Sequence, residues 1–190
     1  VEILDNSLLS ILDSTARIEV LASGFKWSEG PLWIREGSYL LFSDIPPNKI
    51  MKWSEEKGLE EYLYPSGYTG NETREGEPGA NGLILDSAKR LVMCQHGDRR
   101  MARMNAPLAN PKADFITLAD KYDGRKFNSP NDAVYHSSGE LYFTDPPYGL
   151  PGLFNDPKKE TPHQGVYMVK DGKTTLLTTD LGGPNGIAFS

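Results

Sequence analysis

The feature that most constrains the fold of this 190-residue chain is an internal repeat. A polar pair followed by a short apolar run occurs four times, with spacings of 52, 50 and 54 residues between pairs. The four pairs are Glu29-Gly30, Asn81-Gly82, Asn131-Asp132 and Asn185-Gly186, and the apolar runs are 32–34, 83–85, 133–135 and 187–189. Three further apolar runs follow each of the first three copies. Four strands in about fifty residues are typical of one blade of a β-propeller.

The repeat also predicts where the strands lie. Second strands are expected at 39–44, 91–96 and 141–145, third strands at 49–53, 100–104 and 165–169, and fourth strands at 60–63, 114–118 and 174–177. Long stretches with a 3.6-residue period are nearly absent. The exception is 6–13, where one or two helical turns are expected before a strand at 17–22. The sequence therefore predicts an all-β fold.

The chain has room for about three and a half such units, whereas closed propellers have about four to eight blades. We therefore expect residues 1–190 to be one partial propeller domain, the N-terminal part of a longer protein. Alone, such a chain is expected to expose a sheet edge and to aggregate or to need a complementary chain. Its expected parts are a lead-in (1–16), a closing strand (17–22), blade 1 (23–64), a loop (65–80), blade 2 (81–118), blade 3 (119–180) with a long loop (146–164), and the first strand of blade 4 (181–190).

Composition excludes several classes of function. The net charge of -6 provides no positive field for nucleic acid. No apolar run approaches the roughly 20 residues that a membrane span needs, and a hydrophobic share of 38% is that of a soluble globular protein. The single cysteine, Cys94, follows an apolar run and is expected in the core. The sequence thus predicts neither a nucleic-acid partner nor a membrane partner.

Propeller geometry brings the starts of first strands and the ends of second strands to one face. On this face we expect Glu29, Asn81, Asn131 and Asn185 around the central channel, with Asp44, His96 and Asp145 further out. The long loops 65–80 and 146–164 rise from the same face and are expected to form a lid. A carboxylate and several amide oxygens suit a hard divalent cation such as calcium, whereas zinc prefers imidazole and thiolate ligands.

Each of these residues also has a structural interpretation. Glu29 can be a solvated turn residue, and the three asparagines can form Asx-type hydrogen bonds in turns. Asp44 and Asp145 are expected to accept hydrogen bonds from nearby backbone N–H groups. For His96 a structural hydrogen bond and a substrate contact are both open.

Several motifs resemble the bacterial gluconolactonase branch of the SMP-30/gluconolactonase/regucalcin-like family of six-bladed propellers. They are residues 24–31 (GFKWSEGP), 94–100 (CQHGDRR), 128–132 (NSPND), 143–149 (FTDPPYG) and 184–186 (PNG). The resemblance implies a divalent metal held by Glu29, Asn131 and Asn185, together with an aspartate beyond residue 190 that is also the catalytic base. Ser129 stands where animal members have an arginine, so sugar recognition is expected to differ.

The resemblance implies a metal-dependent hydrolase that opens sugar lactones to aldonic acids. Calcium is the expected ion, with zinc, magnesium and manganese as alternatives. Asn131, Asn81, His96 and Tyr148 are the expected substrate contacts. A non-catalytic propeller scaffold and a related esterase or lactonase with another substrate stay open as alternatives. Because the chain starts at Val1 rather than Met, and because millimolar extracytoplasmic calcium suits weak sites, the expected compartment is periplasmic or extracytoplasmic, with the cytoplasm as alternative.

Overall fold

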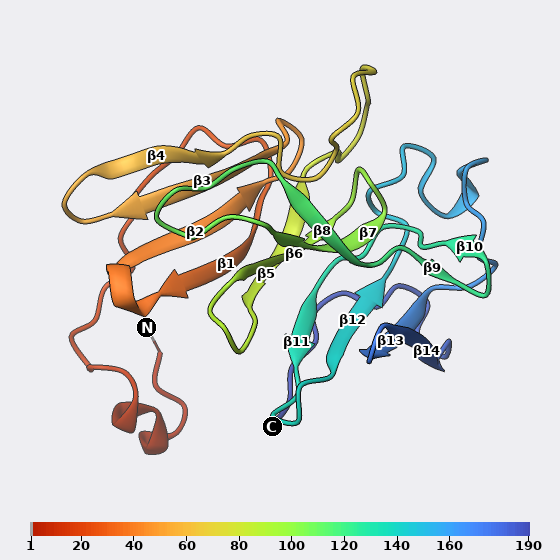
Figure 1. Ribbon diagram of the computed structural model, residues 1–190. Helices are drawn as coiled ribbons and strands as arrows, with labels where there is room; N and C mark the ends of the chain where they lie inside the picture. The colour runs from red at the N-terminus through yellow and green to blue at the C-terminus, as the bar shows by residue number, and fades with distance from the viewer. Residues whose placement is uncertain (1) are drawn as a thin grey trace.

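A computed structural model describes residues 2–190 and shows an all-β protein with three four-stranded antiparallel sheets (Figure 1). Within each sheet, the strands lie side by side in chain order. The first sheet contains β1 (Ser28–Ile34), β2 (Tyr39–Asp44), β3 (Lys49–Ser54) and β4 (Gly58–Leu63). The second contains β5 (Ala80–Leu85), β6 (Leu91–Gln95), β7 (Arg100–Met104) and β8 (Phe115–Ala119), and the third contains β11 (Ala133–Tyr135), β12 (Leu141–Asp145), β13 (Gly165–Lys170) and β14 (Lys173–Thr178).

The chain also contains several smaller elements. The hairpin of β9 (Lys121–Tyr122) and β10 (Arg125–Lys126) lies between the second and third sheets in the chain, and short 3-10 helices occur at η1 (Asn6–Ser10), η2 (Arg35–Gly37) and η3 (Leu153–Asn155). The predicted helical turn is thus confirmed as η1, whose N-terminus is capped by the Asp5 carboxylate. The all-β prediction is confirmed, and the second, third and fourth strands of all three sheets begin within two residues of their predicted positions.

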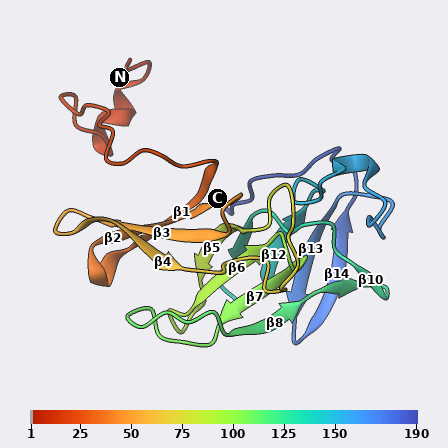
Figure 2. The ribbon, with the colours of Figure 1, turned by 90° about the horizontal axis from the view of Figure 1, so that it is seen from above.

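Two predicted strands do not form. Residues 17–22 and 181–190 belong to no sheet, because neither segment is paired through its backbone with a neighbouring strand of the described chain. Figure 2 shows the N-terminal segment, with η1, standing away from the sheets. The C-terminal segment instead returns alongside the third sheet, where Ile187 N donates to the Asp132 carboxylate at 3.0 Å and Phe189 packs on Tyr142.

The core consists of two apolar layers, one on each side of the second sheet. Successive residues of β6 point to opposite faces, as the period of two requires: Met93 packs into the layer shared with the first sheet, whereas Val92 and Cys94 pack into the layer shared with the third. In the latter layer Phe143 stacks on Tyr167 with ring centroids 5.3 Å apart. Cys94 is fully buried, as expected. No helix of residues 2–190 is long and apolar enough to cross a membrane.

The first strands of the three sheets lie next to one another, β1 against β5 and β5 against β11. Gly30, with a φ of +59°, makes this approach feasible, because a Cβ at this position would lie 2.2 Å from the Asn81 carbonyl oxygen. Gly82 N donates to the Asn131 carbonyl oxygen at 2.8 Å and joins the next pair of sheets. These contacts bring the starts of the first strands together at one end of the molecule.

Candidate functional site

A cavity of about 250 Å³ lies where the first strands begin. Five of the residues that the sequence predicts as metal or substrate ligands line it: Glu29, Asn81, Asn131, Tyr148 and Asn185. Four of them, Glu29, Asn81, Asn131 and Asn185, come from segments separated by 52, 50 and 54 residues in the chain, and Tyr148 comes from the loop 146–164. The spatial convergence that the repeat predicts is therefore present in the structure.

Main-chain contacts between neighbouring sheets place the asparagines. The Ser43 hydroxyl of β2 donates to the Asn81 carbonyl oxygen at 2.7 Å, and the Thr144 hydroxyl of β12 donates to the Asn185 carbonyl oxygen at 2.6 Å. Ser43 and Thr144 occupy equivalent positions, each directly before the last residue of its second strand. A hydroxyl on one sheet thus fixes the backbone of a cavity asparagine in the next repeat.

The side-chain amides of these asparagines are not used in the same way. Among the hydrogen bonds of residues 2–190, none involves the amide group of Asn81, Asn131 or Asn185, although Asn81 and Asn131 are 3% and 2% exposed. The alternative that they form Asx turns is therefore wrong. Buried amides normally find partners, so the amides of Asn81 and Asn131 are available to a ligand in the cavity, and Asn185 adds an amide that is exposed.

Glu29 is partly buried and is held by a neighbouring side chain. The indole Nε1 of Trp27, which also lines the cavity, donates to Glu29 Oε1 at 2.8 Å. This contact leaves Oε2 without a hydrogen-bond partner among the described residues. Glu29 is consequently an oriented cavity carboxylate rather than a freely solvated turn residue.

Asp44 and Asp145 have the structural role that the sequence predicts. Asp44 Oδ1 accepts from Lys26 N and Trp27 N, each at 3.0 Å, and the two carboxylate oxygens of Asp145 accept from Asn128 N and Ser129 N, each at 2.8 Å. Burial raises the pKa of Asp145 to about 7, although the two N–H donors act in the opposite direction. Both aspartates fix the segments that lead into the cavity.

His96 differs from the expectation that it contacts substrate. Its ring is fully buried and does not line the cavity, because the segment around Gly149 packs directly over it. A Cβ at Gly149 would lie only 2.6 Å from the His96 Cβ. His96 Nδ1 instead lies 3.2 Å from Oε2 of Glu77, so that His96 stands behind the cavity wall.

Sequence reasoning missed three lining residues, Trp27, Glu77 and Leu153. Glu77 and Leu153 lie in the irregular segments 65–80 and 146–164, where no strand period assigns a residue to a face. Only the general association of long loops with function points to them. Glu77 matters most, because it gives the cavity a second carboxylate.

The two long loops form fixed walls of the cavity. In the first loop, Arg74 donates to the carbonyl oxygens of Gly97 and Gly149 and so joins the two loops. In the second loop, the Lys158 carbonyl oxygen accepts at 2.9 Å from Nη1 of Arg99, which lies between β6 and β7. The predicted lid is therefore held by hydrogen bonds to the sheets and to the neighbouring loop.

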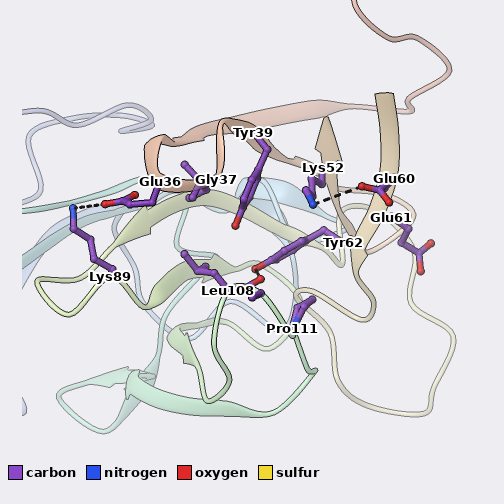
Figure 3. Close-up of a pocket in the computed structure, with 12 residues that line it drawn as sticks. Glu36, Gly37, Tyr39, Lys52, Glu60, Glu61, Tyr62, Lys89, Leu108 and Pro111 are labelled. Atoms are coloured by element: carbon purple, nitrogen blue, oxygen red, sulfur yellow. Dashed lines mark hydrogen bonds and ion pairs between the residues drawn. The ribbon is translucent and has the colours of Figure 1, made fainter. Parts of the chain in front are cut away.

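A larger cleft, of about 630 Å³, opens between the first and second sheets at the end of β1, away from this cavity (Figure 3). Tyr39 and Tyr62 project into it. Four of its charged residues form two ion pairs, with Lys52 Nζ 3.6 Å from the Glu60 carboxylate and Lys89 Nζ 3.8 Å from that of Glu36. This cleft contains none of the predicted site residues.

The donor set of the smaller cavity fits a hard divalent cation. Glu29 offers a carboxylate oxygen, and Asn131 and Asn185 offer amide oxygens that accept no hydrogen bond from residues 2–190. Calcium and magnesium prefer such oxygen ligands. Within residues 2–190 no group of three or more His, Cys, Asp or Glu side chains is placed to hold a metal, so the donors of this part of the chain are not those of a typical zinc centre.

Comparison with known proteins gives a consistent family. The sequence profile of the SMP-30/gluconolactonase/LRE-like region matches residues 27–190. A curated gluconolactonase of Zymomonas mobilis is 39% identical over 186 residues, which are 95% of this chain and 51% of that protein. The chain thus spans about half the length of this relative.

Two solved structures described as gluconolactonases are also similar to this chain. A protein provisionally described as a gluconolactonase by a structural genomics consortium superposes with a TM-score of 0.81 at 31% identity, covering 98% of this chain and 60% of that one. A gluconolactonase from Xanthomonas campestris, described as important in glucose secondary metabolic pathways, superposes with a TM-score of 0.67 at 29% identity. That match covers 84% of this chain and 50% of the other.

Proposed function

This chain belongs to the SMP-30/gluconolactonase/LRE-like family, and on that premise we propose that it supplies the metal-binding and substrate-binding residues of a sugar-lactone hydrolase. The observation that carries the proposal is the convergence in one cavity of Glu29 with three asparagines whose amides have no partner among the described residues. Blade stacking alone does not require such amides, which argues against a non-catalytic scaffold. The gluconolactonase relatives support a lactone as substrate.

Glu29, Asn131 and Asn185 would hold the metal, and calcium is the proposed ion because all three donors are oxygens. When bound, a divalent cation supplies Lewis-acid polarisation of the lactone carbonyl and stabilises negative charge on its oxygen. The neutral amides of Asn131 and Asn185 leave most of the ionic charge uncompensated, and the Trp27 hydrogen bond keeps Glu29 oriented. These residues therefore bind and orient rather than transfer protons.

In the proposed reaction the oxygen of water adds to the carbonyl carbon and the ring C–O bond breaks. One proton of the water passes to a base, and the base returns it to the departing ring oxygen, which becomes a hydroxyl group, so that the product is a hydroxy acid. Asn81 and Tyr148 line the same cavity and are proposed substrate contacts. From the family resemblance, we propose that the base is an aspartate beyond residue 190, in a six-bladed full-length protein.

The test is hydrolysis of glucono-1,5-lactone by the full-length protein, followed by acid release at constant pH. We expect a chelator to abolish activity, calcium to restore it, and Glu29→Gln to lower kcat/KM about 100- to 1000-fold, in the range found when a transition-state stabilising group is removed. Glu36→Gln is the matched control, because Glu36 lies in the distant cleft. A chelator-insensitive rate that survives Glu29→Gln contradicts the proposal.

A panel of lactones and aryl esters separates the remaining alternative, a related esterase. The wrong ring or leaving group should lose most of the rate. If an aryl ester is turned over faster than any sugar lactone in a metal-dependent reaction, the protein is an esterase and the proposed substrate is wrong.

A further inference from the structure

Two neighbouring side chains, His96 and Glu77, form a feature that the proposed metal site does not use. His96 is 0% exposed, and neither of its ring nitrogens has a hydrogen-bond partner in the described chain. Fully buried polar groups are normally paired. An unpaired buried imidazole next to a ligand cavity therefore points to a partner that completes its contacts.

Glu77 is the group within reach. Its Oε2 atom lies 3.2 Å from His96 Nδ1, a hydrogen-bond distance, but the two groups are not aligned for a bond. Donation from His96 Nδ1–H to this oxygen requires the carboxylate to turn into line with the imidazole ring. The Glu77 side chain is 27% exposed and lines the cavity. One of its oxygens thus faces the buried imidazole, while the group as a whole remains accessible to a ligand.

The backbone holds this pair in place from both sides. His96 N donates to the Gly79 carbonyl oxygen at 3.2 Å, and Gly79 N donates to the Ile45 carbonyl oxygen at 2.9 Å. Gly79 admits no side chain, because a Cβ would lie 2.4 Å from the Ile45 carbonyl oxygen. Glu77 is therefore carried on a fixed segment tied to the strand end that carries His96, which is an arrangement suited to recognition rather than to a mobile loop.

The chemistry of the surrounding wall indicates the ligand. A carboxylate accepts hydrogen bonds from hydroxyl groups, and Asn81 and Tyr148 beside it add an amide and a phenol. We propose that Glu77 accepts hydrogen bonds from the hydroxyl groups of a polyhydroxylated substrate, and that His96 is a positioning residue that orients the Glu77 carboxylate. This inference rests on the proposed function, and it makes Glu77 a determinant of specificity for sugar lactones over unsubstituted ones.

The test compares two six-membered lactones, glucono-1,5-lactone and δ-valerolactone, which has the ring ester but no hydroxyl groups. For Glu77→Gln in the full-length protein, we expect the loss of kcat/KM to be at least ten times larger for gluconolactone, chiefly through KM. Glu75→Gln is the control, because Glu75 is exposed in the same loop and does not line the cavity. Equal losses for both lactones, or no loss for either, would overturn the inference.

The role of His96 is tested by a double-mutant cycle. His96→Gln should raise KM for gluconolactone in the wild-type background and have little further effect on KM in the Glu77→Gln background. Additive effects in the two backgrounds would contradict positioning through Glu77.

A binding measurement separates failure of the inference from failure of the proposed function. D-glucitol has the hydroxyl groups but no ester, and its binding is followed by saturation-transfer NMR. If the wild type hydrolyses neither lactone but binds glucitol, and Glu77→Gln weakens that binding at least about tenfold, the inference holds while the hydrolase proposal fails. No glucitol binding, or binding unaffected by Glu77→Gln, overturns the inference whatever the enzyme activity.

Discussion

Asn128 and Asn131 lie three residues apart in the segment that leads into β11, and both are buried, yet their side chains are used in opposite ways. Asn128 Nδ2 donates to the carbonyl oxygens of Asp145 and His163, each at 3.0 Å, and its Oδ1 accepts from the Thr161 hydroxyl at 2.9 Å. The Asn131 amide makes no hydrogen bond within residues 2–190 and faces the cavity.

A structural asparagine and a functional one are thus distinguished by what their side-chain amides bind. The amide of Asn128 joins the end of β12 to the long loop 146–164, so its hydrogen-bonding groups are already used. Asn131 is fixed through its backbone alone, since Asn131 N donates to the Thr144 carbonyl oxygen at 2.9 Å and its own carbonyl accepts from Gly82 N. Its amide is left for a ligand. A residue held by its main chain, with its polar side chain unpaired in a cavity, is the pattern that we associate with the site.

The largest expected effect is on folding. Asn128→Ala removes the three hydrogen bonds of this buried amide, to the carbonyl oxygens of Asp145 and His163 and from the Thr161 hydroxyl, and one hydrogen bond contributes about 1 kcal/mol. We expect the free energy of unfolding to fall by about 3 kcal/mol in urea denaturation of the full-length protein. A loss below about 1 kcal/mol would show that water replaces the amide and would break the comparison.

The second prediction is a loss of activity that is not accompanied by a loss of stability. Asn131→Ala should lower kcat/KM for glucono-1,5-lactone about 100-fold, which corresponds to about 2.7 kcal/mol, because an oxygen ligand of the proposed metal is removed. The urea midpoint should shift little, since no hydrogen bond of the amide is broken. An activity loss explained entirely by unfolding would place Asn131 in the same structural class as Asn128.

A smaller effect is expected where a backbone contact places the site. Thr144→Val removes the hydroxyl that donates to the Asn185 carbonyl oxygen at 2.6 Å. The same hydroxyl also accepts from Asp132 N at 3.2 Å. We therefore expect about a tenfold loss of kcat/KM and about 2 kcal/mol of stability, since one hydrogen bond contributes about 1 kcal/mol. Thr174→Val in β14 is the control, because its hydroxyl makes no hydrogen bond among the described residues. Equal effects of both substitutions would contradict the proposal that the Thr144 hydroxyl positions Asn185.

The prediction with the smallest effect, counted per pH unit, concerns the dependence of stability on pH. Burial raises the pKa of Asp145 to about 7 from an ordinary value of 3.8. Between these values the folded state holds a proton that the unfolded state has lost, so stability falls as pH rises through this window and levels off above the folded pKa. We expect a higher urea midpoint at pH 5 than at pH 8, with a slope of at most about 1.4 kcal/mol per pH unit. Asp145→Asn should flatten this slope, and an unchanged slope would contradict the assignment.

The sequence predicts the strands well because the repeat period and the apolar runs report directly on burial. It also predicts which residues share the cavity, since Glu29, Asn81 and Asn131 lie at equivalent positions of successive repeats. It predicts Glu77 poorly, because this residue lies in a loop whose path depends on long-range contacts such as that of Gly79 with Ile45. The sequence also places His96 in the cavity, which it does not line, for a related reason. Its strand ends at the predicted face, but the segment around Gly149 covers the ring.

The strands predicted at 17–22 and 181–190 show a different limit. Their apolar residues match a strand pattern, and Ile18 and Val20 are 91% and 85% exposed in the structure. A strand needs backbone partners as well as an apolar pattern, and the pattern alone does not reveal whether a neighbouring strand is present.

The most direct test of the central claim, that the unpaired amides and Glu29 form a metal site, is sensitised terbium luminescence. Trp27 lines the cavity and can transfer excitation energy to Tb³⁺, a calcium substitute with the same preference for oxygen ligands. We expect saturable luminescence, which calcium lowers by displacing Tb³⁺. Glu29→Gln and Asn131→Ala should each abolish it, whereas Glu36→Gln should retain it. Luminescence that is absent from the wild type, or that persists in both cavity variants, would contradict the claim.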